Sequence, residues 1–472
     1  MRITLFVFLA CLSACAATSG SVPQTEPRPD LPVERKAIAA KDPLINGVWR
    51  SRGYGWILQV EDGAIRQYEA GGFGCYARPE GAEGQTAMLS LPFSQYRLST
   101  NGETAMFMYG PDTTGPIFER LPALPDACAQ PAKASVETSF EIFLSMFDEH
   151  YAHFGDRGAD WPKLAQEAQA IFNANPTEKG FIEAADHLLK ALQDSHTRLI
   201  AFTQEGRQRI QYGLGETLPR IRKDNGETAW LIGLIEQLTG EILDPGARHV
   251  GEDRILWGTI GGEIGYLQIF QMGGFAGLEI DDPDWAASEL RILDQELDEA
   301  FAAFANAKAV ILDMSNNRGG YDEIARRLAA RFSDAPFHAY NLSADGDGLE
   351  PLAKIIEPEP DHRFTGPVYL LTSDVTVSGG EIATLSLRQL PNVTQVGQPT
   401  RGAFSTPLAK ILPNGWIVEL ANETFSAPDG EVFAGRGIPP QKPLDVFSEA
   451  DPVASHGDAI RAIVALIRET DD

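Results

Sequence analysis

The fold of this chain is decided by Val368–Leu390, which reads V-Y-L-L-T-S-D-V-T-V-S-G-G-E-I-A-T-L-S-L-R-Q-L. The apolar run Val368–Leu371 is typical of a buried strand, and Glu381–Leu390 is typical of an amphipathic helix. Ser378 stands between them and is followed by two glycines. A hydroxyl on such a turn lies beside free backbone N–H groups, which suits a nucleophile whose oxyanion those groups hold. The residues alone leave open that Ser378 is only the N-cap of the helix.

Strands and helices alternate around this stretch. Strands are expected at Ile264–Phe270, Ala309–Leu312 and Val393–Val396, and helices at Trp285–Ala307 and Asp322–Phe332. This alternation predicts an α/β core with parallel strand pairs. A hairpin, Leu408–Leu412 with Trp416–Leu420, and a closing helix, Ala454–Arg468, follow the core.

The chain before the core has two different patterns. Gly47–Cys128 is rich in aromatic and β-branched residues and carries hairpin signals at Glu61-Asp62-Gly63 and Asn101-Gly102. These signals predict a small antiparallel β-barrel or sandwich. Ser135–Leu199 has apolar residues three and four apart, which predicts three helices.

The segment Thr203–Gly261 between the helices and the core is less regular. Its pieces Thr228–Leu234 and Arg254–Gly258 have strand-like composition. Neither a PDZ pattern nor an internal repeat is apparent in the sequence.

The N-terminus is typical of an exported protein. It reads M-R-I-T-L-F-V-F-L-A-C-L-S-A-C, a charged start followed by a short apolar core, which is too short to span a bilayer. The box Leu12-Ser13-Ala14-Cys15 resembles that of bacterial lipoproteins and implies that Cys15 is lipidated. Ala16 then favours the outer membrane by resemblance to Gram-negative lipoproteins. An ordinary signal peptide is the alternative. The Pro- and Ser-rich stretch Ala16–Lys41 is expected to be a tether.

Composition limits the partners. The chain has 472 residues, 43% hydrophobic and 22% charged, with a net charge of -27 and a pI of about 4.7. This acidity argues against nucleic acid and against an electrostatic hold on anionic lipid. Outside the leader two cysteines remain, Cys75 and Cys128, which an oxidising compartment would allow to pair, although two separate thiols are the alternative. No cysteine or histidine spacing of the kind that binds metal appears.

The stretch T-S-D-V-T-V-S-G-G-E, residues Thr372–Glu381, resembles the nucleophile motif of the tail-specific (C-terminal processing) serine peptidases. The resemblance runs from about Ser135 to Val446. It implies a twisted sheet with flanking helices similar to the crotonase fold, peptides or protein C-termini as substrates, and no cofactor. Oligomeric state is not indicated.

The resemblance also selects a general base among eight histidines, which the residues alone do not. In the branch related to the tricorn core protease a Ser-His pair supplies the base, and Ser195-His196 matches that pair, with Ser195 implied to orient the imidazole. The other branch uses a Ser–Lys dyad, but Ala403 stands where that lysine would be. Lys410 is interpreted as a surface residue of a strand.

The oxyanion hole is expected from a second motif. The segment 312–320, L-D-M-S-N-N-R-G-G, resembles the family pattern D-x-R-x-N-x-G-G, with Ser315 in place of the usual arginine. One donor would be the Gly379 N–H and the other would come from Gly319 or Gly320. Without the resemblance, the two glycines are equally well explained as a turn.

A late segment departs from the family. Where relatives that use histidine carry a glutamate and an aspartate, this chain has Ala434 and Gln441. Loss of an orienting carboxylate costs several orders of magnitude in rate elsewhere. Glu431 on the adjacent turn is a candidate replacement.

These observations combine into one domain scheme. We predict a signal peptide (1–14), a lipidated tether (15–43), a small β domain (44–130), a helical segment (135–202), a connecting segment (203–262), an α/β peptidase core (263–448) and a C-terminal helix (449–472). The function predicted is a lipid-anchored serine peptidase facing the periplasm. The alternative is a catalytically impaired relative that binds ligands or peptides through its β domain.

Overall fold

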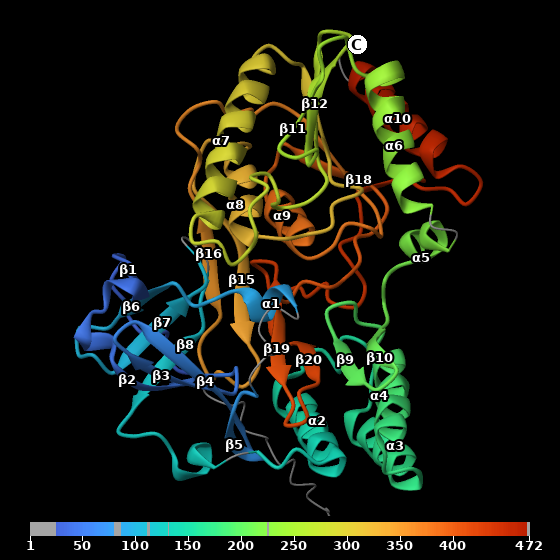
Figure 1. Ribbon diagram of the computed structural model, residues 1–472. Helices are drawn as coiled ribbons and strands as arrows, with labels where there is room; N and C mark the ends of the chain where they lie inside the picture. The colour runs from blue at the N-terminus through green and yellow to red at the C-terminus, as the bar shows by residue number, and fades with distance from the viewer. Residues whose placement is uncertain (1–24, 80–85, 111–113, 131, 224–225, 470–472) are drawn as a thin grey trace, which may run out of the picture.

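A seven-stranded sheet forms the centre of the molecule (Figure 1). The computed structural model describes residues 25–79, 86–110, 114–130, 132–223 and 226–469. The strands, in spatial order, are β11 (Arg248–Val250), β12 (Ile255–Ile260), β13 (Ile264–Ile269), β14 (Ala309–Asp313), β17 (Val368–Thr372), β18 (Val393–Gly397) and β22 (Lys442–Pro443). The pairs from β13 to β22 are parallel, as the alternation of strands and helices predicts.

Helices cover both faces of this sheet because its strands are apolar on both sides. In β14, Val310 and Leu312 pack into the core cluster that holds helices α7 (Trp285–Ala303), α8 (Asp322–Ala330) and α9 (Gly379–Leu387). Ala309 and Ile311 point to the opposite face, toward α6 (Glu227–Gln237) and α10 (Pro452–Glu469). A short helix, α5 (Thr217–Arg222), precedes α6.

Two smaller sheets lie beside the central one. The first has the order β10 (Gly206–Gln211), β9 (Arg198–Thr203), β20 (Ile417–Ala421) and β19 (Pro407–Ile411), and the second β16 (Leu352–Ile356), β15 (Phe337–Ala344) and β21 (Glu423–Ser426). The first sheet packs with α2 (Val136–His150), α3 (Trp161–Ala174) and α4 (Glu178–Leu192), the three helices that the apolar spacing predicted.

The N-terminal β domain is one antiparallel sheet of eight strands rather than a two-sheet sandwich. Its order is β1 (Lys36–Ala37), β6 (Gln95–Leu98), β7 (Thr104–Met108), β8 (Ile117–Leu121), β2 (Gly47–Ser51), β3 (Trp56–Glu61), β4 (Ala64–Gly71) and β5 (Gly74–Ala77), and helix α1 (Ala87–Ser90) lies between β5 and β6. Both predicted hairpins are present, as β3–β4 and β6–β7. A disulfide joins Cys75 to Cys128.

The β domain docks against strand β19. Trp49 and Trp56 of the β domain share one core cluster with Phe140 of α2 and Trp416 beside β20. The Tyr76 hydroxyl donates to the backbone oxygen of Ile411, 2.8 Å away, at the end of β19. The β domain and the helical segment are therefore packed as one body against this edge of the peptidase core.

This docking overturns the interpretation of Lys410 as a surface residue. Its side chain is fully buried, and its Nζ lies 3.0 Å from the Glu69 carboxylate of β4 and 2.8 Å from the Gly55 backbone oxygen. Burial lowers the pKa of Lys410 to about 8, against the opposing effect of Glu69. The outward face of β19 is covered by a domain that lies about three hundred residues earlier in the chain.

A second prediction was also wrong. Thr228–Leu234, expected to be strand-like, lies inside helix α6. Its β-branched and aromatic residues hid the helical spacing, in which Trp230 and Leu234 are the buried pair one turn apart. No helix in the described ranges is long and apolar enough to cross a membrane.

Candidate active site

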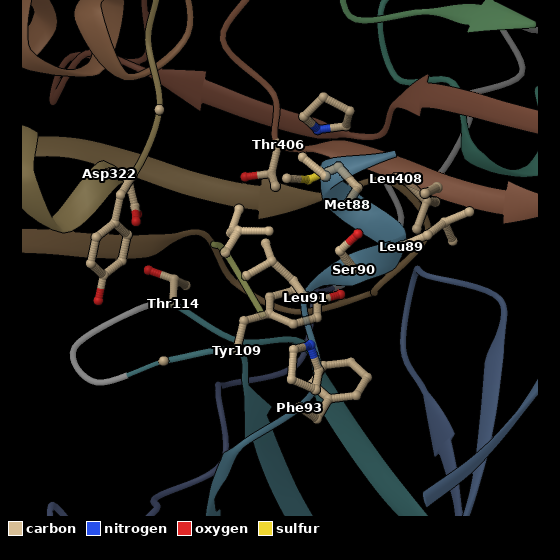
Figure 2. Close-up of a pocket in the computed structure, with 18 of the residues that line it drawn as sticks. Met88, Leu89, Ser90, Leu91, Phe93, Tyr109, Thr114, Asp322, Thr406 and Leu408 are labelled. Carbon is tan, nitrogen blue, oxygen red and sulfur yellow. The ribbon is translucent and has the colours of Figure 1, made fainter. Parts of the chain in front are cut away.

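A cavity of about 1300 Å³ opens between the N-terminal β domain and the peptidase core (Figure 2). Ser378 and His196 both line it, and they come from opposite parts of the molecule, the start of α9 and the turn before β9. Thr406 and Leu408 of the β19 region form one side, and residues of α1 together with Tyr109, which follows β7, form another. The predicted nucleophile and the predicted base thus face the same space.

Ser378 occupies a sharp turn between strand β17 and helix α9. Its backbone has φ 57° and ψ −123°, a conformation that costs energy for any residue other than glycine. Gly319 makes the turn possible because a Cβ there would lie 2.5 Å from the Ser378 Cβ. Gly380 is needed for the same reason, since a Cβ there would lie 2.6 Å from the side-chain oxygen of Asn317. The G-G motifs are therefore required by close packing at the nucleophile.

Glu381 holds this turn in place from inside the protein. Its carboxylate is fully buried and accepts hydrogen bonds from Thr400 Oγ1 at 2.6 Å and from the N–H groups of Gly402 (2.6 Å) and Ala403 (2.8 Å). The Ser378 N–H lies 3.3 Å from the same carboxylate. Burial raises the pKa of Glu381, and these hydrogen bonds oppose the rise. The carboxylate ties the nucleophile turn to the 400–403 segment.

The structure distinguishes the two candidates for the second oxyanion donor. The Gly319 N–H donates to Asn317 Oδ1 at 2.9 Å and is already used. The N–H groups of Gly320 and Gly379 donate no hydrogen bond to the described residues, and a Cβ on Gly379 would lie 3.2 Å from the Gly320 nitrogen. Gly379 and Gly320 are thus adjacent and available, whereas Gly319 has a structural task.

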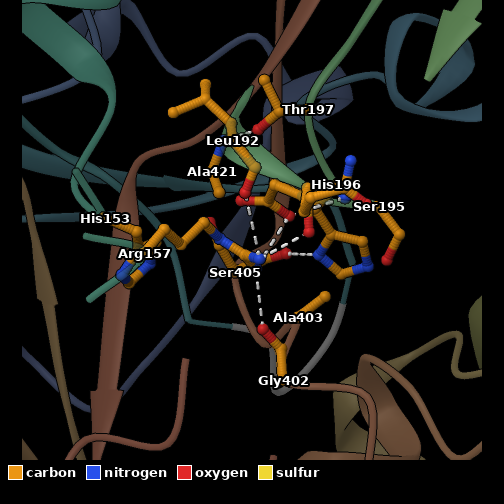
Figure 3. Close-up of polar contacts among 12 residues, drawn as sticks. His153, Arg157, Leu192, Ser195, His196, Thr197, Gly402, Ala403, Ser405 and Ala421 are labelled. Atoms are coloured by element: carbon orange, nitrogen blue, oxygen red, sulfur yellow. Dashed lines mark hydrogen bonds and ion pairs between the residues drawn. The ribbon is translucent and has the colours of Figure 1, made fainter. Parts of the chain in front are cut away.

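His196 is oriented by a backbone carbonyl. Its Nδ1 lies 2.5 Å from the Ser405 oxygen (Figure 3), so Nδ1 carries the proton and Nε2 is left as the acceptor in the neutral ring. Burial lowers the pKa of His196 to about 4, against the raising effect of the Asp194 charge. The imidazole is therefore neutral at pH 7 and able to accept a proton.

A buried carboxylate lies directly behind this histidine. Asp194 accepts a hydrogen bond from the His196 backbone N–H at 2.9 Å and another from the Tyr151 hydroxyl at 2.9 Å. The Arg157 guanidinium lies 3.3 Å from the same carboxylate and also donates to the Gly402 oxygen, as Figure 3 shows. Burial works to raise the pKa of Asp194, but Arg157 and His196 hold it below its usual range.

Ser195 makes none of the described contacts with the imidazole. Its Oγ is buried without a hydrogen-bond partner among the described residues, and its backbone oxygen accepts from Gln211. The orienting contact seen in the structure is the one from Ser405. The described residues also include no hydrogen bond between Ser378 Oγ and His196, so the two meet through the cavity that they share.

The positions that depart from the family pattern have structural tasks. Ala434 is buried, and Glu431, the candidate replacement for the missing glutamate, instead pairs with Arg436 at 2.8 Å on an exposed turn. Gln441 is uncharged, and its side-chain oxygen accepts a hydrogen bond from the Gln395 N–H of β18. Ser315 donates to the buried Asp313 at 2.6 Å. Asp194 accepts from the His196 N–H and Glu381 lies beside the Ser378 N–H; the sequence motifs contain both carboxylates, but the sequence alone assigned them no role.

Comparison with known proteins agrees with this arrangement. Residues 263–443 match the model of peptidase family S41. This region of the chain is similar to that family. The matched region contains Ser378 and both glycines of the 319–320 pair, whereas His196 precedes it.

Individual relatives are distant. The carboxy-terminal processing protease CtpA of Bacillus subtilis (strain 168) is 28% identical over 159 residues, which are 32% of this chain and 33% of that protein. A Chlamydia pneumoniae protein is 25% identical over 115 residues, 24% of this chain and 19% of its own length. The chain thus spans a third or less of the curated relatives it matches. The crystal structure of a peptidase from Parabacteroides merdae ATCC 43184, described as putative, has a TM-score of 0.57 at 21% identity and covers 71% of this chain and 97% of that one, which shows a shared fold.

Proposed function

We propose that this protein is a serine peptidase in which Ser378 is the nucleophile and His196 the general base. The observation that carries the proposal is the pairing of a strained serine turn, at the start of a buried helix, with a neutral histidine on one cavity. A serine nucleophile needs a base that accepts its proton and donors that hold the oxyanion. His196 is the proposed base, and the N–H groups of Gly379 and Gly320, which donate to none of the described residues, are the proposed donors.

The first step follows from the tautomer of His196. Ser378 Oγ attacks the peptide carbonyl carbon while His196 Nε2 takes the hydroxyl proton, because Nδ1 is occupied by the Ser405 carbonyl. The carbonyl oxygen becomes an oxyanion, held by the N–H groups of Gly379 and Gly320. His196 then returns the proton to the leaving amine, and water hydrolyses the acyl-enzyme by the reverse roles.

Asp194 supplies the negative charge that a protonated imidazole needs. Its carboxylate is the largest influence that raises the pKa of His196, so it stabilises the imidazolium formed during attack. Asp194 would thus take the role of the family's glutamate, whose position is occupied here by Ala434. It does so from a different place, because it binds the His196 backbone and not its ring. Because a neutral carbonyl orients Nδ1, we expect a weaker base than in a triad with a carboxylate.

Covalent labelling tests the proposal. The chain without its first 24 residues is treated with a fluorophosphonate, and the adduct is mapped by mass spectrometry. We expect an adduct on Ser378 that is absent from Ser378→Ala and strongly reduced in His196→Ala. The matched control is His187→Ala, a half-exposed histidine on α4 that contacts Glu167 outside the cavity. Equal labelling in the His196 and His187 variants would overturn the role of His196.

We further propose that the protein acts in the bacterial envelope as an outer-membrane lipoprotein facing the periplasm, with peptides or protein C-termini as substrates. The support is the Leu12–Cys15 box, which lies outside the described residues. Of the predicted tether after it, residues 25–41 are described, and its end is not free, since Lys36–Ala37 pairs with β6 and Ile38 is buried. Replacing Cys15 by serine is expected to move the protein from the membrane fraction to the soluble fraction after export. An unchanged distribution would refute lipidation at Cys15.

A second candidate is a peptide-binding protein that does not turn over. Two observations favour it, the absence of a hydrogen bond between Ser378 and His196 in the described structure and the alanine at position 434. This candidate predicts peptide binding that is equal in the wild type and in Ser378→Ala, with no product formed. Any cleavage that Ser378→Ala abolishes decides for the peptidase.

A further inference from the structure

Helix α1 presents apolar side chains to the active-site cavity without a core of its own. None of its four residues is buried, although Met88 and Leu89 are large and apolar. Together with Leu91, which follows the helix, they line the cavity and belong to no apolar cluster formed by the described residues. We call Met88, Leu89 and Leu91 the α1 wall.

The α1 wall begins with a capped helix and is followed by an anchored residue. At its start Thr86 Oγ1 accepts a hydrogen bond from the Leu89 N–H, 3.3 Å away. At its end Phe93 is buried in the β domain and stacks on Tyr109 with ring centroids 4.6 Å apart. Figure 2 shows Met88 and Leu89 toward Thr406 and Leu408 of the β19 region, with Leu91 over Phe93. The stacking of Phe93 anchors the chain that follows the α1 wall to the β domain.

The wall shares its cavity with the nucleophile. Ser378 and Ile382, one turn apart at the start of α9, line the same space, as do Phe404 and Leu408. A peptide whose carbonyl reaches Ser378 therefore extends a neighbouring side chain into a space with apolar groups from both domains. Exposed apolar side chains gathered in a cleft mark a binding surface.

Several charged residues on the cavity have polar or charged partners, whereas Arg66, Glu279 and Asp281, which also line it, form no ion pair with the described residues. Arg78 pairs with Glu69 at 2.7 Å, Asp322 with Arg326 at 2.6 Å, and Arg198 with Glu419. Glu423 accepts from the Tyr54 hydroxyl at 2.7 Å. These contacts reduce the attraction of their members for a charged substrate side chain, and none of the charged residues belongs to the α1 wall, where the contact offered is apolar.

We propose that the α1 wall is a specificity-determining surface that receives a large apolar side chain, such as Leu, Met or Phe, of the peptide bound at Ser378. The proposal rests on the proposed peptidase function and extends it to the substrate class. It assigns to the N-terminal β domain a direct share in substrate selection.

The test compares matched variants on a set of fluorogenic peptides that differ at one position at a time near the cleaved bond. Each position carries Leu, Phe, Asp or Lys, and kcat/KM is measured for the wild type, Leu91→Asp and Met88→Asp. The control is Leu44→Asp, which changes an apolar residue of the same domain that is 63% exposed and lies outside the cavity. Leu91→Ala is included as a milder change.

At one peptide position we expect the wild-type kcat/KM to be at least about tenfold higher with Leu or Phe than with Asp. Leu91→Asp should reduce this ratio by about tenfold or more and raise kcat/KM for the peptide that carries Lys. Leu44→Asp keeps the wild-type preference. A small fluorophosphonate should label Ser378 at a similar rate in all variants, which shows that the site is intact. An unchanged preference in Leu91→Asp, Met88→Asp and Leu91→Ala overturns the specificity role, and so does an equal rise for every peptide, which would make α1 a lid.

The outcome also separates the two proposals. If the wild type is labelled and cleaves peptides, but its preference does not depend on the wall, only the specificity role of the α1 wall is overturned. Absence of both labelling and cleavage in the folded wild type overturns the peptidase function and the wall with it.

Discussion

The pH dependence of Ser378 reactivity gives the sharpest test of the site. Burial of the His196 imidazole lowers its pKa from 6.5 to about 4, so the ring loses its charge at a lower pH than an ordinary histidine. Only the neutral ring accepts the Ser378 proton. The reactivity of Ser378 should therefore persist well into the acid range.

The size of the effect follows from the two pKa values. At pH 5 an imidazole with a pKa of about 4 is about 90% neutral, whereas one with a pKa of 6.5 is about 3% neutral, a difference of about thirtyfold. We expect the rate of fluorophosphonate labelling at pH 5 to be close to its value at pH 7.5, and the rate to fall about tenfold per unit below pH 4.

The assay is single-turnover labelling of Ser378 between pH 3.5 and pH 8, with circular dichroism at each pH to confirm that the protein is folded. Asp194→Asn is the informative companion because the carboxylate raises the pKa of His196. Its removal moves the acid limb to still lower pH and slows labelling at pH 7. A half-maximal rate near pH 6.5 in the wild type would refute the burial argument.

Three further predictions concern stability. His456→Ala removes the partner 2.7 Å from the buried Asp313 carboxylate and should lower the free energy of unfolding by about 3–5 kcal/mol in denaturant titrations. The pKa of Asp313 is lowered, against the effect of burial, by His456, so this contribution is present above the unfolded-state pKa and is lost as pH falls through the folded one. Cys75→Ser opens a loop with a sequence separation of 53 and should cost up to about 4 kcal/mol, which disappears when both proteins are measured under reducing conditions. Glu381→Gln replaces the carboxylate that accepts from the Ala403 N–H by a neutral amide, and it should lower the free energy of unfolding by about 1–3 kcal/mol and slow Ser378 labelling. An unchanged melting temperature and labelling rate would contradict the role of Glu381 in holding the turn.

The elements of the peptidase core could be predicted because their signals are local. Val368–Leu371 is a continuous apolar run, and a strand buried on both faces needs nothing else to be recognised. Ser378 followed by two glycines places the nucleophile at a turn before a helix, and the structure has that turn. Each of these patterns is complete within about ten residues.

The contacts that orient His196, the proposed base, could not be predicted in this way. The Ser405 oxygen that orients the ring lies 209 residues further along the chain. Because it is a backbone atom, no residue type in the sequence indicates it. Lys410 shows the same limit in reverse. A lysine in an alternating strand indicates a solvent face, but Glu69 and the β domain enclose it. Long-range docking decides both cases, and local pattern does not encode it.

This docking also decides how the β domain should be tested. Deletion of residues 47–128 is the obvious experiment on its role. It would remove Glu69, the partner of Lys410, and Tyr76, which donates a hydrogen bond to the Ile411 oxygen. Deletion would also expose Phe140 and Trp416, which share a core cluster with Trp49 and Trp56 of the β domain. Deletion would therefore abolish activity whether or not the domain touches substrate. Point changes at Met88 and Leu91, which line the cavity and pack into no core cluster of the described residues, change the binding surface and keep the contacts of Lys410 with Glu69 and of Tyr76 with the Ile411 oxygen.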